Sequence, residues 1–349
     1  MPINFVIDSL RHFMSITLKP EISVIVCDHK ADFIYKCVES IQKSVEVTYE
    51  IIIITSHKGL YKLGIQDCIV KYHPGMPAAK RNYGVKFSKA SLIAFFDDDV
   101  EIDPKCLVSL KGGLYPSVGM TYGKLWNMEH RDRFDEAGGF MTWTGFIWSR
   151  AAQNDKDTGQ FDKEAYILAG KSASCMVKKE VFNKVGGFDE SFGILGEETD
   201  LSWRIWLSGK YVLYAPGATG YHAFNTKFKP PEKHYTSDRV HFNGCRNYLT
   251  MLIKNLGKEH LWIISVHMMI WFFAGLAMIG TLKIREGGNI LRGIAYVLSH
   301  LSLIRKKRRL IQSERVINER NIWEIIHKSS PRGYYTQRFF RYILSAMHG

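Results

Sequence analysis

Short apolar runs separated by a helical pattern organise the N-terminal part of the chain. The runs ISVIVC at 22–27, EIIII at 50–54 and LIAFF at 92–96 have strand length and do not alternate with polar residues. Such continuous runs are typical of strands buried on both faces of a parallel sheet. A helical pattern at about 33–43 separates the first two runs. The order strand, helix, strand predicts a right-handed crossover unit and an α/β, Rossmann-like sheet.

Turn residues and periodicity predict three further helices. A turn at Pro74-Gly75 precedes a helix that begins near Pro77. Residues 200–209 (DLSWRIWLSG) predict a helix closed by their final glycine. Residues 1–20 predict a short amphipathic helix ended by a proline, which packs on the domain or touches a membrane.

Long apolar stretches return only in the C-terminal third. The stretch at 261–282 is about long enough to span a bilayer. A single crossing would place the RKKRR segment at 305–309 outside, against the positive-inside tendency. The next apolar run, 290–304, contains Arg292 and His300 and is short for a return span. We therefore expect helices that lie in the membrane interface, with a true span as the alternative.

The charge of the chain is concentrated in the same region. The 349 residues carry a formal charge of +13, and residues 251–349 alone hold 16 Lys and Arg against 5 Asp and Glu. This coincidence of basic and apolar residues indicates an anionic membrane surface, and the sequence shows no nucleic-acid-binding motif. A hydrophobic content of 46% is enough for a core. The six cysteines lack metal-type spacing and predict buried thiols in a reducing compartment.

Three adjacent carboxylates, Asp97, Asp98 and Asp99, follow the apolar run at 92–96. Ligands of open α/β sheets bind at the carboxyl ends of the strands, and hard divalent cations take oxygen ligands. The cluster therefore predicts a Mg²⁺ or Mn²⁺ site, with a solvated acidic turn as the alternative. Lys80 and Arg81 lie in the first turns of the helix near Pro77, where they would face a diphosphate or, alternatively, the solvent.

Five motifs in this order resemble the family 2 glycosyltransferases, which have the GT-A fold. They are SVIV, EIIII, A-x-x-RN-x-G, FFDDDV and VGGFDESFGILGEETDLSWRIWLSGK, all within residues 20–255. The resemblance implies a GT-A catalytic domain at 21–255, a mixed Rossmann-like sheet flanked by helices. The N-terminal helix at 1–20 precedes it, and a helical, basic and apolar membrane-associated region follows at 256–349.

The resemblance and the chemistry of sugar transfer together assign roles to single residues. Asp99 is the expected direct metal ligand, with Asp97 and the late histidine His222 completing the shell; a packed histidine is the alternative for His222. Glu198 matches the catalytic base, and Glu197 would orient it or hold the acceptor. The remaining assignments are Asp28, Thr55, Lys80, Arg81, Asp97 and Asp98 to the nucleotide sugar, Asp200 to a second candidate base or a first-turn helix acid, and Trp203, Arg204 and Arg246 to the acceptor or a phosphate.

Two of these positions have simpler explanations, and so do three tryptophans. Arg204 could pair with Asp200 one turn earlier, and Arg246 could be an ordinary helix-surface residue. The composition of the segment 121–170 is typical of a variable insertion that binds the acceptor. Within it, Trp126, Trp143 and Trp148 could stack on sugars or pack in the core.

The function that we expect is inverting, metal-dependent transfer of a hexose from a nucleotide sugar to a glycan or a polyprenyl-diphosphate-linked acceptor, at the cytoplasmic face of a membrane. One alternative is a nucleotidyltransferase that makes a nucleotide sugar, although no Gly-rich phosphate loop follows the first strand. Another is a non-catalytic glycan- or membrane-binding module. The chain has Asp28-His29-Lys30 after the first strand and Thr55 after the second, where the family has other residues, so the nucleotide is left open.

Overall fold

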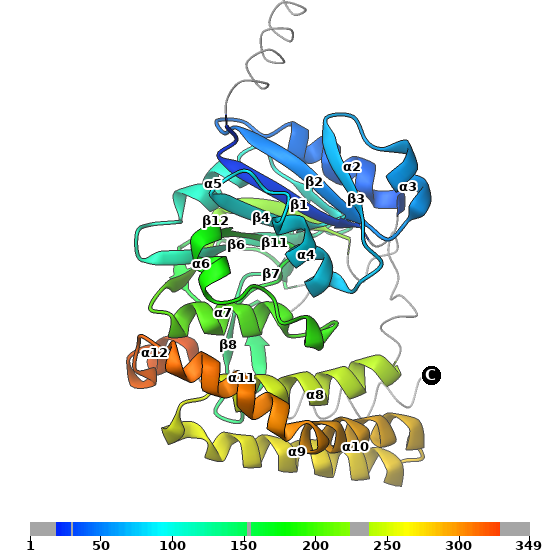
Figure 1. Ribbon diagram of the computed structural model, residues 1–349, viewed down its shortest axis with the longest axis vertical. Coiled ribbons are helices and arrows are strands. Elements are labelled where there is room, and N and C mark those ends of the chain that lie inside the picture. Colours follow the sequence, from blue (N-terminus) through cyan, green and yellow to red (C-terminus); the bar gives the residue numbers. More distant parts are fainter. Residues whose placement is uncertain (1–18, 29–30, 152–154, 224–236, 329–349) are drawn as a thin grey trace, which may run out of the picture.

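A computed structural model describes residues 19–28, 31–151, 155–223 and 237–328, and the helix predicted at 1–20 lies almost wholly outside them. In the described part, a mixed sheet flanked by helices lies above a layer of long helices (Figure 1). Every strand predicted from an apolar run is confirmed, because β1 (Ile22–Asp28), β2 (Tyr49–Thr55) and β4 (Leu92–Asp97) have these positions.

The sheet has the order β10-β12-β6-β11-β4-β1-β2-β3. Strands β1, β2, β3 (Cys68–Tyr72) and β4 are parallel to their neighbours within this group, and β6 (Val118–Asn127) is parallel to β12 (Tyr211–His222). The antiparallel strand β11 (Ser174–Lys178) joins the two groups by pairing with β4 and β6, and β10 (Ala165–Tyr166) pairs with β12 at the edge. Two short strands, β5 (Val100–Ile102) and β7 (Phe134–Glu136), pair with β12 and β6 outside this path.

Separate hydrophobic clusters cover the two faces of the sheet. Ile25, Ile54 and Phe95 belong to one cluster, whereas Val24 and Phe96 belong to the other. Alternate side chains of a strand point to opposite faces, so each strand here needs apolar residues at consecutive positions. This explains why the runs in the sequence do not alternate.

Helices connect the strands, and the three predicted at about 33–43, near Pro77 and at 200–209 are present with small differences in bounds. The helices are α2 (Ala31–Gln42), α3 (Lys58–Leu63), α4 (Pro77–Val85), α5 (Cys106–Gly112), α6 (Lys179–Lys184), the short η1 (Glu190–Phe192) and α7 (Glu197–Leu207). The sequence predicts that α7 begins at Asp200, but it begins at Glu197. Three acidic residues in its first turn complement the positive end of the helix dipole.

The lower layer consists of α8 (Ser237–Asn255), α9 (Trp262–Gly280), α10 (Ile284–Ser299), α11 (Leu301–Ser313) and α12 (Glu319–Ile326), with the short η3 (Lys258–His260) before α9. Its core contains Cys245 and Leu249 from α8, Trp271 from α9 and Ile290 from α10. A hairpin of β8 (Gly139–Met141) and β9 (Ile147–Ser149) reaches this core through Phe146. The sheet domain and the helical layer are thus packed together through α8 and this hairpin.

Candidate active site

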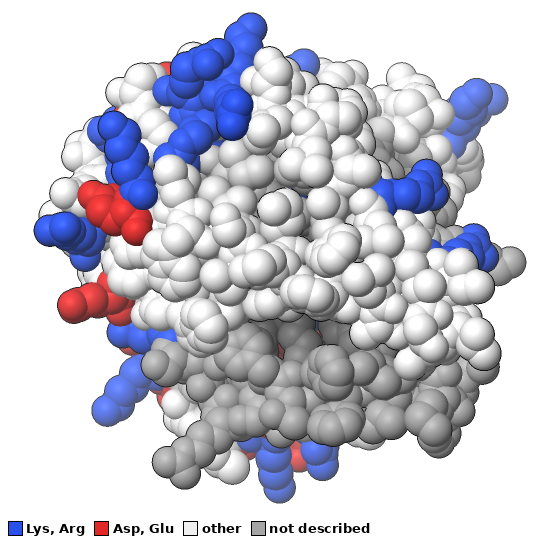
Figure 2. Space-filling model, turned by 90° about the horizontal axis from the view of Figure 1, so that it is seen from below, with Lys and Arg blue, Asp and Glu red and all other residues white. Residues whose placement is uncertain are grey.

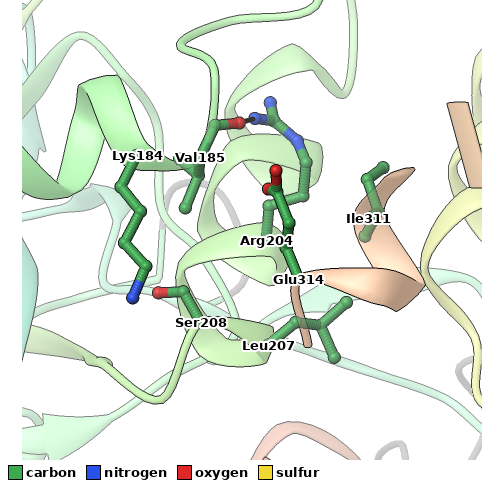
Figure 3. Close-up of a pocket in the computed structure, with 7 residues that line it drawn as sticks. All are labelled: Lys184, Val185, Arg204, Leu207, Ser208, Ile311 and Glu314. Carbon is green, nitrogen blue, oxygen red and sulfur yellow. Dashed lines mark hydrogen bonds between the residues drawn. The ribbon is translucent and has the colours of Figure 1, made fainter. Parts of the chain in front are cut away.

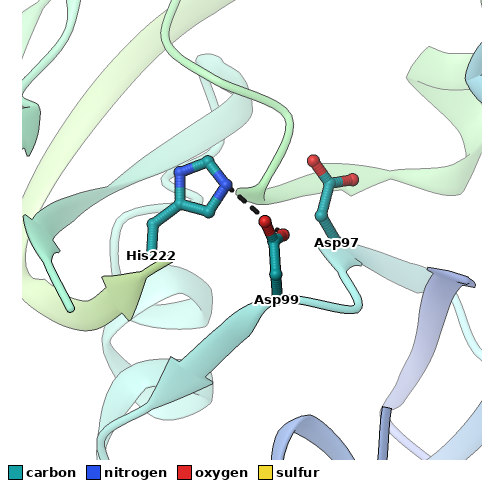
Figure 4. Close-up of side chains that lie close together, drawn as sticks. All are labelled: Asp97, Asp99 and His222. Carbon is teal, nitrogen blue, oxygen red and sulfur yellow. Dashed lines mark ion pairs between the residues drawn. The ribbon is translucent and has the colours of Figure 1, made fainter. Parts of the chain in front are cut away.

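The strand pairing of β5 brings the acidic turn next to a histidine. Strand β4 ends at Asp97, β5 begins at Val100, and Val100 pairs with His222 of β12. Possible ligand atoms of Asp97, Asp99 and His222 all lie within 4.8 Å of one another (Figure 4). Two carboxylates and one imidazole form a donor set that fits a divalent cation such as Mn²⁺. The sequence placed these three residues together, and the structure does so as well.

A second carboxylate, Asp135 of β7, orients the histidine. His222 Nε2 lies 3.4 Å from Asp99 Oδ1, and His222 Nδ1 lies 2.8 Å from Asp135 Oδ2. Lys171 Nζ lies 2.6 Å from the other oxygen of Asp135. Burial opposes the charge on Asp135, but Lys171 and His222 prevail and lower its pKa to about 2. Asp135 is a site residue that the sequence does not predict, because nothing in the sequence links the segment 121–170 to His222.

The first two strands end in a buried polar group. Asp28 and Thr55 are directly paired in the register of β1 and β2, and the Thr55 hydroxyl donates a hydrogen bond to the Asp28 carboxylate. Lys80 Nζ donates to the Asp28 carbonyl oxygen and, over 3.2 Å, to Ser56 Oγ. Burial lowers the pKa of Lys80. Lys80 therefore ties the carboxyl ends of β1 and β2 together.

Arg81 connects the acidic turn with the start of α7. Its Nη2 lies 2.7 Å from Asp97 Oδ1, and its Nη1 lies 3.2 Å from Glu197 Oε1. Arg81 is only 2% exposed and Lys80 only 3%. The alternative that these two cations face the solvent is therefore wrong. The DDD motif and the EETD motif, about a hundred residues apart, belong to one buried site.

Two adjacent glutamates open α7. Glu197 is buried and Glu198 is partly exposed, after a turn in which Gly196 has φ of 87°. Burial and the neighbouring Glu197 raise the pKa of Glu198 well above its ordinary value. Burial also raises the pKa of Glu197, and the neighbouring Arg81 guanidinium partly offsets this rise. A partly exposed carboxylate with a raised pKa is suited to accept a proton.

Asp200 occupies a different environment from the two glutamates. It is fully buried, and its oxygens lie 2.9 Å from Arg204 Nε, 2.9 Å from Lys254 Nζ and 2.9 Å from Asn255 Nδ2. The predicted pairing of Asp200 with Arg204 is thus confirmed. Lys254 Nζ also bonds Asp189 of the GGFDE motif. These contacts make Asp200 part of an ion cluster between α7 and α8.

Two residues expected to meet the acceptor or a phosphate have other contacts. Trp203 has no exposed surface and packs in the core, so the expected contact with an acceptor does not fit this structure. Arg246 Nη2 donates to Phe192 O over 2.6 Å, and Asn247 Nδ2 donates to Leu195 O over 2.7 Å. Arg246 and Asn247 therefore hold the loop that leads into α7.

The three tryptophans of the segment 121–170 differ in exposure. Trp126 is stacked 5.5 Å from Tyr221, and its Nε1 donates to Asp157. Trp148 packs 5.6 Å from Phe140. Trp143 is 50% exposed, at the turn between β8 and β9. Among these three, Trp143 offers the largest exposed fraction to a ligand.

A pocket with an empty volume of about 300 Å³ lies elsewhere, between α6, α7 and α11 (Figure 3). It is lined by Lys184, Val185, Arg204, Leu207, Ser208, Ile311 and Glu314. Arg204 is held there by a hydrogen bond to Val185 O. None of the acidic turn residues lines this pocket, so we do not assign it to the candidate active site.

Comparison with known proteins finds glycosyltransferases. No family model matches the chain. The chain is 22% identical over 254 residues to a Drosophila melanogaster protein named polypeptide N-acetylgalactosaminyltransferase 10, covering 66% of this chain and 39% of that protein. It is 28% identical over 172 residues to a pre-mycofactocin glycosyltransferase of Mycobacterium tuberculosis, covering 47% of this chain and 34% of that one. The chain thus spans less than half the length of these curated relatives.

Among solved structures, the chain is similar to GalNAc-T7 in complex with UDP, GalNAc and Mn²⁺. The TM-score is 0.54 at 16% identity, and the match covers 81% of this chain and 58% of that one. The predicted fold is confirmed: a mixed, mostly parallel sheet flanked by helices, as in GT-A glycosyltransferases. Among the described residues, one helix, Lys258–Gly280, is long and apolar enough to cross a membrane by length and composition.

Proposed function

We propose that this protein is a glycosyltransferase that uses a nucleotide sugar and a divalent cation, Mn²⁺ or Mg²⁺. The observation that carries the proposal is the double ion pair of Arg81, which joins the Asp97 turn to Glu197. This ion pair brings the possible cation ligands and a candidate general base into one site. The sequence relatives named as glycosyltransferases and the GT-A fold support the same activity.

On the donor side, Asp97, Asp99 and His222 would hold the cation. When bound, a divalent cation neutralises the leaving diphosphate and polarises its oxygens. Asp135 fixes the ring of His222, and Lys171 balances the charge of Asp135. Asp28, Thr55 and Asp98, at the carboxyl ends of β1, β2 and β4, are assigned to the nucleotide sugar, and Lys80 positions this edge of the sheet.

On the acceptor side, Glu198 would act as the general base. It takes the proton of the acceptor hydroxyl while that oxygen forms a bond to the anomeric carbon. The bond from this carbon to the diphosphate oxygen breaks, and the diphosphate leaves with the electron pair. Attack from the side opposite the leaving group inverts the anomeric centre. Glu197, whose charge is balanced by Arg81, positions Glu198. Asp200 is a poor alternative for the general base, because its carboxylate is held in a buried ion cluster.

The acceptor that we propose is a glycan or a polyprenyl-diphosphate-linked sugar, presented at the cytoplasmic face of a membrane, and the donor carries a hexose. The helical layer from residue 256 onward supports this acceptor class, because it is rich in basic and apolar residues and contacts the loop before α7. We propose residues 21–255 as the catalytic part and 256–349 as the membrane-associated part. The turn residue Trp143, which is 50% exposed, is the proposed stacking residue for an acceptor sugar.

A thermal-shift panel of nucleotide sugars identifies the donor. Each donor is added to the full chain with Mn²⁺, with Mg²⁺ and with EDTA, because a bound ligand stabilises the folded state by mass action. We expect one nucleotide class to raise the melting temperature with metal and to have no effect with EDTA. Asp99→Asn should remove this shift, and Asp132→Asn, an exposed aspartate, should keep it. If no nucleotide sugar shifts the wild-type protein in the presence of metal, the proposed activity is wrong.

A further inference from the structure

The two sides of α9 differ in what they contact. Residues at helical spacing face the protein: Ile263, His267, Trp271, Gly275 and Met278 are all buried. The other side is exposed although it is apolar, with exposed fractions of 37% to 63% for Trp262, Met269, Ile270, Phe272, Phe273 and Leu276. A helix that is apolar all round normally has a second partner that covers its outer side.

This exposed side continues into α10. Leu282 is 87% exposed, Ile284 is 66% exposed and Leu298 is 57% exposed. From residue 261 to residue 310 the chain has eight Lys and Arg and a single acid, Glu286. Seen from below, much of the described surface lacks charged side chains, and Lys and Arg lie toward its margins (Figure 2). We name the exposed residues of α9, together with Leu282, Ile284 and Leu298, the docking face.

The helix α9 is attached to the protein along its whole length. His267 Nδ1 lies 2.7 Å from Thr144 O in the β8–β9 hairpin, and Trp271, one turn later on the same helix, supports the ring by donating to His267 Nε2 over 2.9 Å. Near its end, Gly275 approaches Gly287 of α10 so closely that a Cβ at Gly287 would lie 2.4 Å from the Gly275 carbonyl oxygen. These contacts hold the inner side of α9 against the β8–β9 hairpin and α10. α9 therefore lies along the lower side of the molecule (Figure 1).

The basic segment of α11 divides into two sets. Lys307 Nζ bonds Asp189 over 2.7 Å, and Arg308 Nη1 donates to Leu256 O over 2.6 Å. Arg305, Lys306 and Arg309 are exposed. Two members of the RKKRR segment thus hold the protein together. Three cations remain available to a surface.

We propose that the docking face inserts into the interfacial region of an anionic bilayer, with α9 lying in the plane of the membrane. Exposed apolar faces of this kind mark interaction sites, and an apolar helix side accompanied by Lys and Arg matches the boundary between acyl chains and anionic headgroups. A second copy of the chain is a poorer occupant. A symmetric dimer through this face would bring together two copies of a segment, 261–310, that has eight Lys and Arg against one acid.

Vesicle flotation of the full chain tests the apolar contribution. We expect strong binding to phosphatidylcholine vesicles that contain phosphatidylglycerol, and at least tenfold weaker binding for the double variant Phe272→Ser/Phe273→Ser. The matched control is Tyr35→Ser/Tyr61→Ser, because these exposed aromatic residues lie on α2 and α3, away from the docking face. Unchanged flotation of the Phe272/Phe273 variant, or a wild type that stays dimeric and does not bind vesicles, overturns the proposal.

Salt dependence tests the electrostatic contribution. Arg305→Gln, Lys306→Gln and Arg309→Gln together should weaken binding to anionic vesicles about tenfold or more and flatten its salt dependence. The control replaces three exposed lysines of the sheet domain, Lys43, Lys105 and Lys156, by glutamine. Equal effects of the two triple variants, or equal wild-type binding to neutral and anionic vesicles, contradict the electrostatic part.

Measurements of insertion depth distinguish an α9 that lies in the plane of the membrane from one that spans the bilayer. A fluorophore is placed on Trp262→Cys, Phe273→Cys or Leu282→Cys in a Cys68→Ser background, and quenched by lipids labelled near the headgroup or deep in the chain. The other five native thiols are buried. We expect the shallow quencher to be the stronger one at all three positions. Stronger deep quenching at Phe273→Cys indicates a span and overturns the proposal. Vesicle binding and insertion depth are measured without donor or acceptor, so a negative result would not contradict the proposed sugar transfer.

Discussion

Arg81 is the residue that makes one site out of two motifs. Its guanidinium lies 2.7 Å from Asp97 and 3.2 Å from Glu197; the bond to Glu197 is buried and the bond to Asp97 is partly buried. Planar donors of this kind suit two carboxylates at once, which a lysine ammonium would do less well. The sequence identified Arg81 as a site residue but assigned it to a diphosphate. Its bond to Glu197 joins residues 116 positions apart, which a local pattern does not reveal.

Replacing Glu198 by glutamine tests the candidate base. Glu198→Gln keeps the size of the side chain but removes the proton acceptor, so turnover should fall by about 10²- to 10⁴-fold. Donor affinity should stay the same, because the cation ligands are not altered. Steady-state kinetics and calorimetry measure the two quantities. Glu39→Gln, at an exposed surface pair, is the control. More than a tenth of wild-type turnover in Glu198→Gln would move the base to another residue.

Asp135 offers a test of the cation site that does not depend on catalysis. Asp135→Asn removes the carboxylate that orients His222 and leaves Lys171 without this partner. We expect Mn²⁺ affinity to fall by about 10- to 100-fold, as for other carboxylates that support a metal-binding histidine. Mn²⁺ titration followed by electron paramagnetic resonance measures it. Asp132→Asn, an exposed aspartate three residues earlier, should bind Mn²⁺ as the wild type does. Equal affinities of both variants would separate Asp135 from the cation.

At the scale of elements, a buried ion cluster joins α7, α8 and α11. Lys254 bonds Asp189 and Asp200, and Lys307 reaches Asp189 from α11. Removing one partner of a buried pair leaves an uncompensated charge, so Lys254→Ala should lower the free energy of unfolding by about 3–5 kcal/mol. Urea denaturation measures this loss. Lys43→Ala, which breaks an exposed pair, should cost less than about 1 kcal/mol. Similar losses in both variants would contradict a stabilising cluster.

The same cluster predicts how stability depends on pH. Lys254 and its neighbours overcome the effect of burial and lower the pKa of Asp189 and of Asp200 in the folded state. Groups with lowered folded pKa values stabilise the protein above their unfolded pKa of about 3.9, and this stability is lost as the pH falls through the folded values. The free energy of unfolding should therefore decrease from pH 5 to pH 3. In Lys254→Ala this decrease should be smaller, and an identical pH slope would show that the cluster does not cause it.

The elements show where prediction from sequence succeeds and where it stops. The strands at 22–28, 49–55 and 92–97 follow from apolar runs, because burial on both faces requires such runs. The helix α7 begins at Glu197, three residues before the predicted start at Asp200, because acidic side chains also stabilise the first turn of a helix through its dipole. The division of RKKRR into inward and outward residues depends on tertiary contacts with Asp189 and Leu256. Asp97 and Asp99 are predicted because strand ends collect at one edge of such a sheet, and His222 is predicted from the family resemblance; neither argument predicts Asp135 or Lys171.

For the whole molecule, the sheet domain and the helical layer have separate tasks in this account. The sheet domain gathers the cation ligands and the glutamates, and the helical layer presents the docking face. Lys307 and Arg308 connect the layer to the segments around α7 and α8. The proposed function uses both parts: the sheet domain for the nucleotide sugar and the helical layer for the membrane.

Donor turnover by the full chain tests the central claim most directly. The release of nucleoside diphosphate is measured for a panel of nucleotide sugars in the presence of Mn²⁺, and again after EDTA is added. We predict that one nucleotide sugar is turned over with Mn²⁺ and that EDTA suppresses this turnover, because the cation that Asp97, Asp99 and His222 are proposed to hold would neutralise the leaving diphosphate. Turnover that EDTA leaves unchanged, or no release from any nucleotide sugar with Mn²⁺, would contradict it.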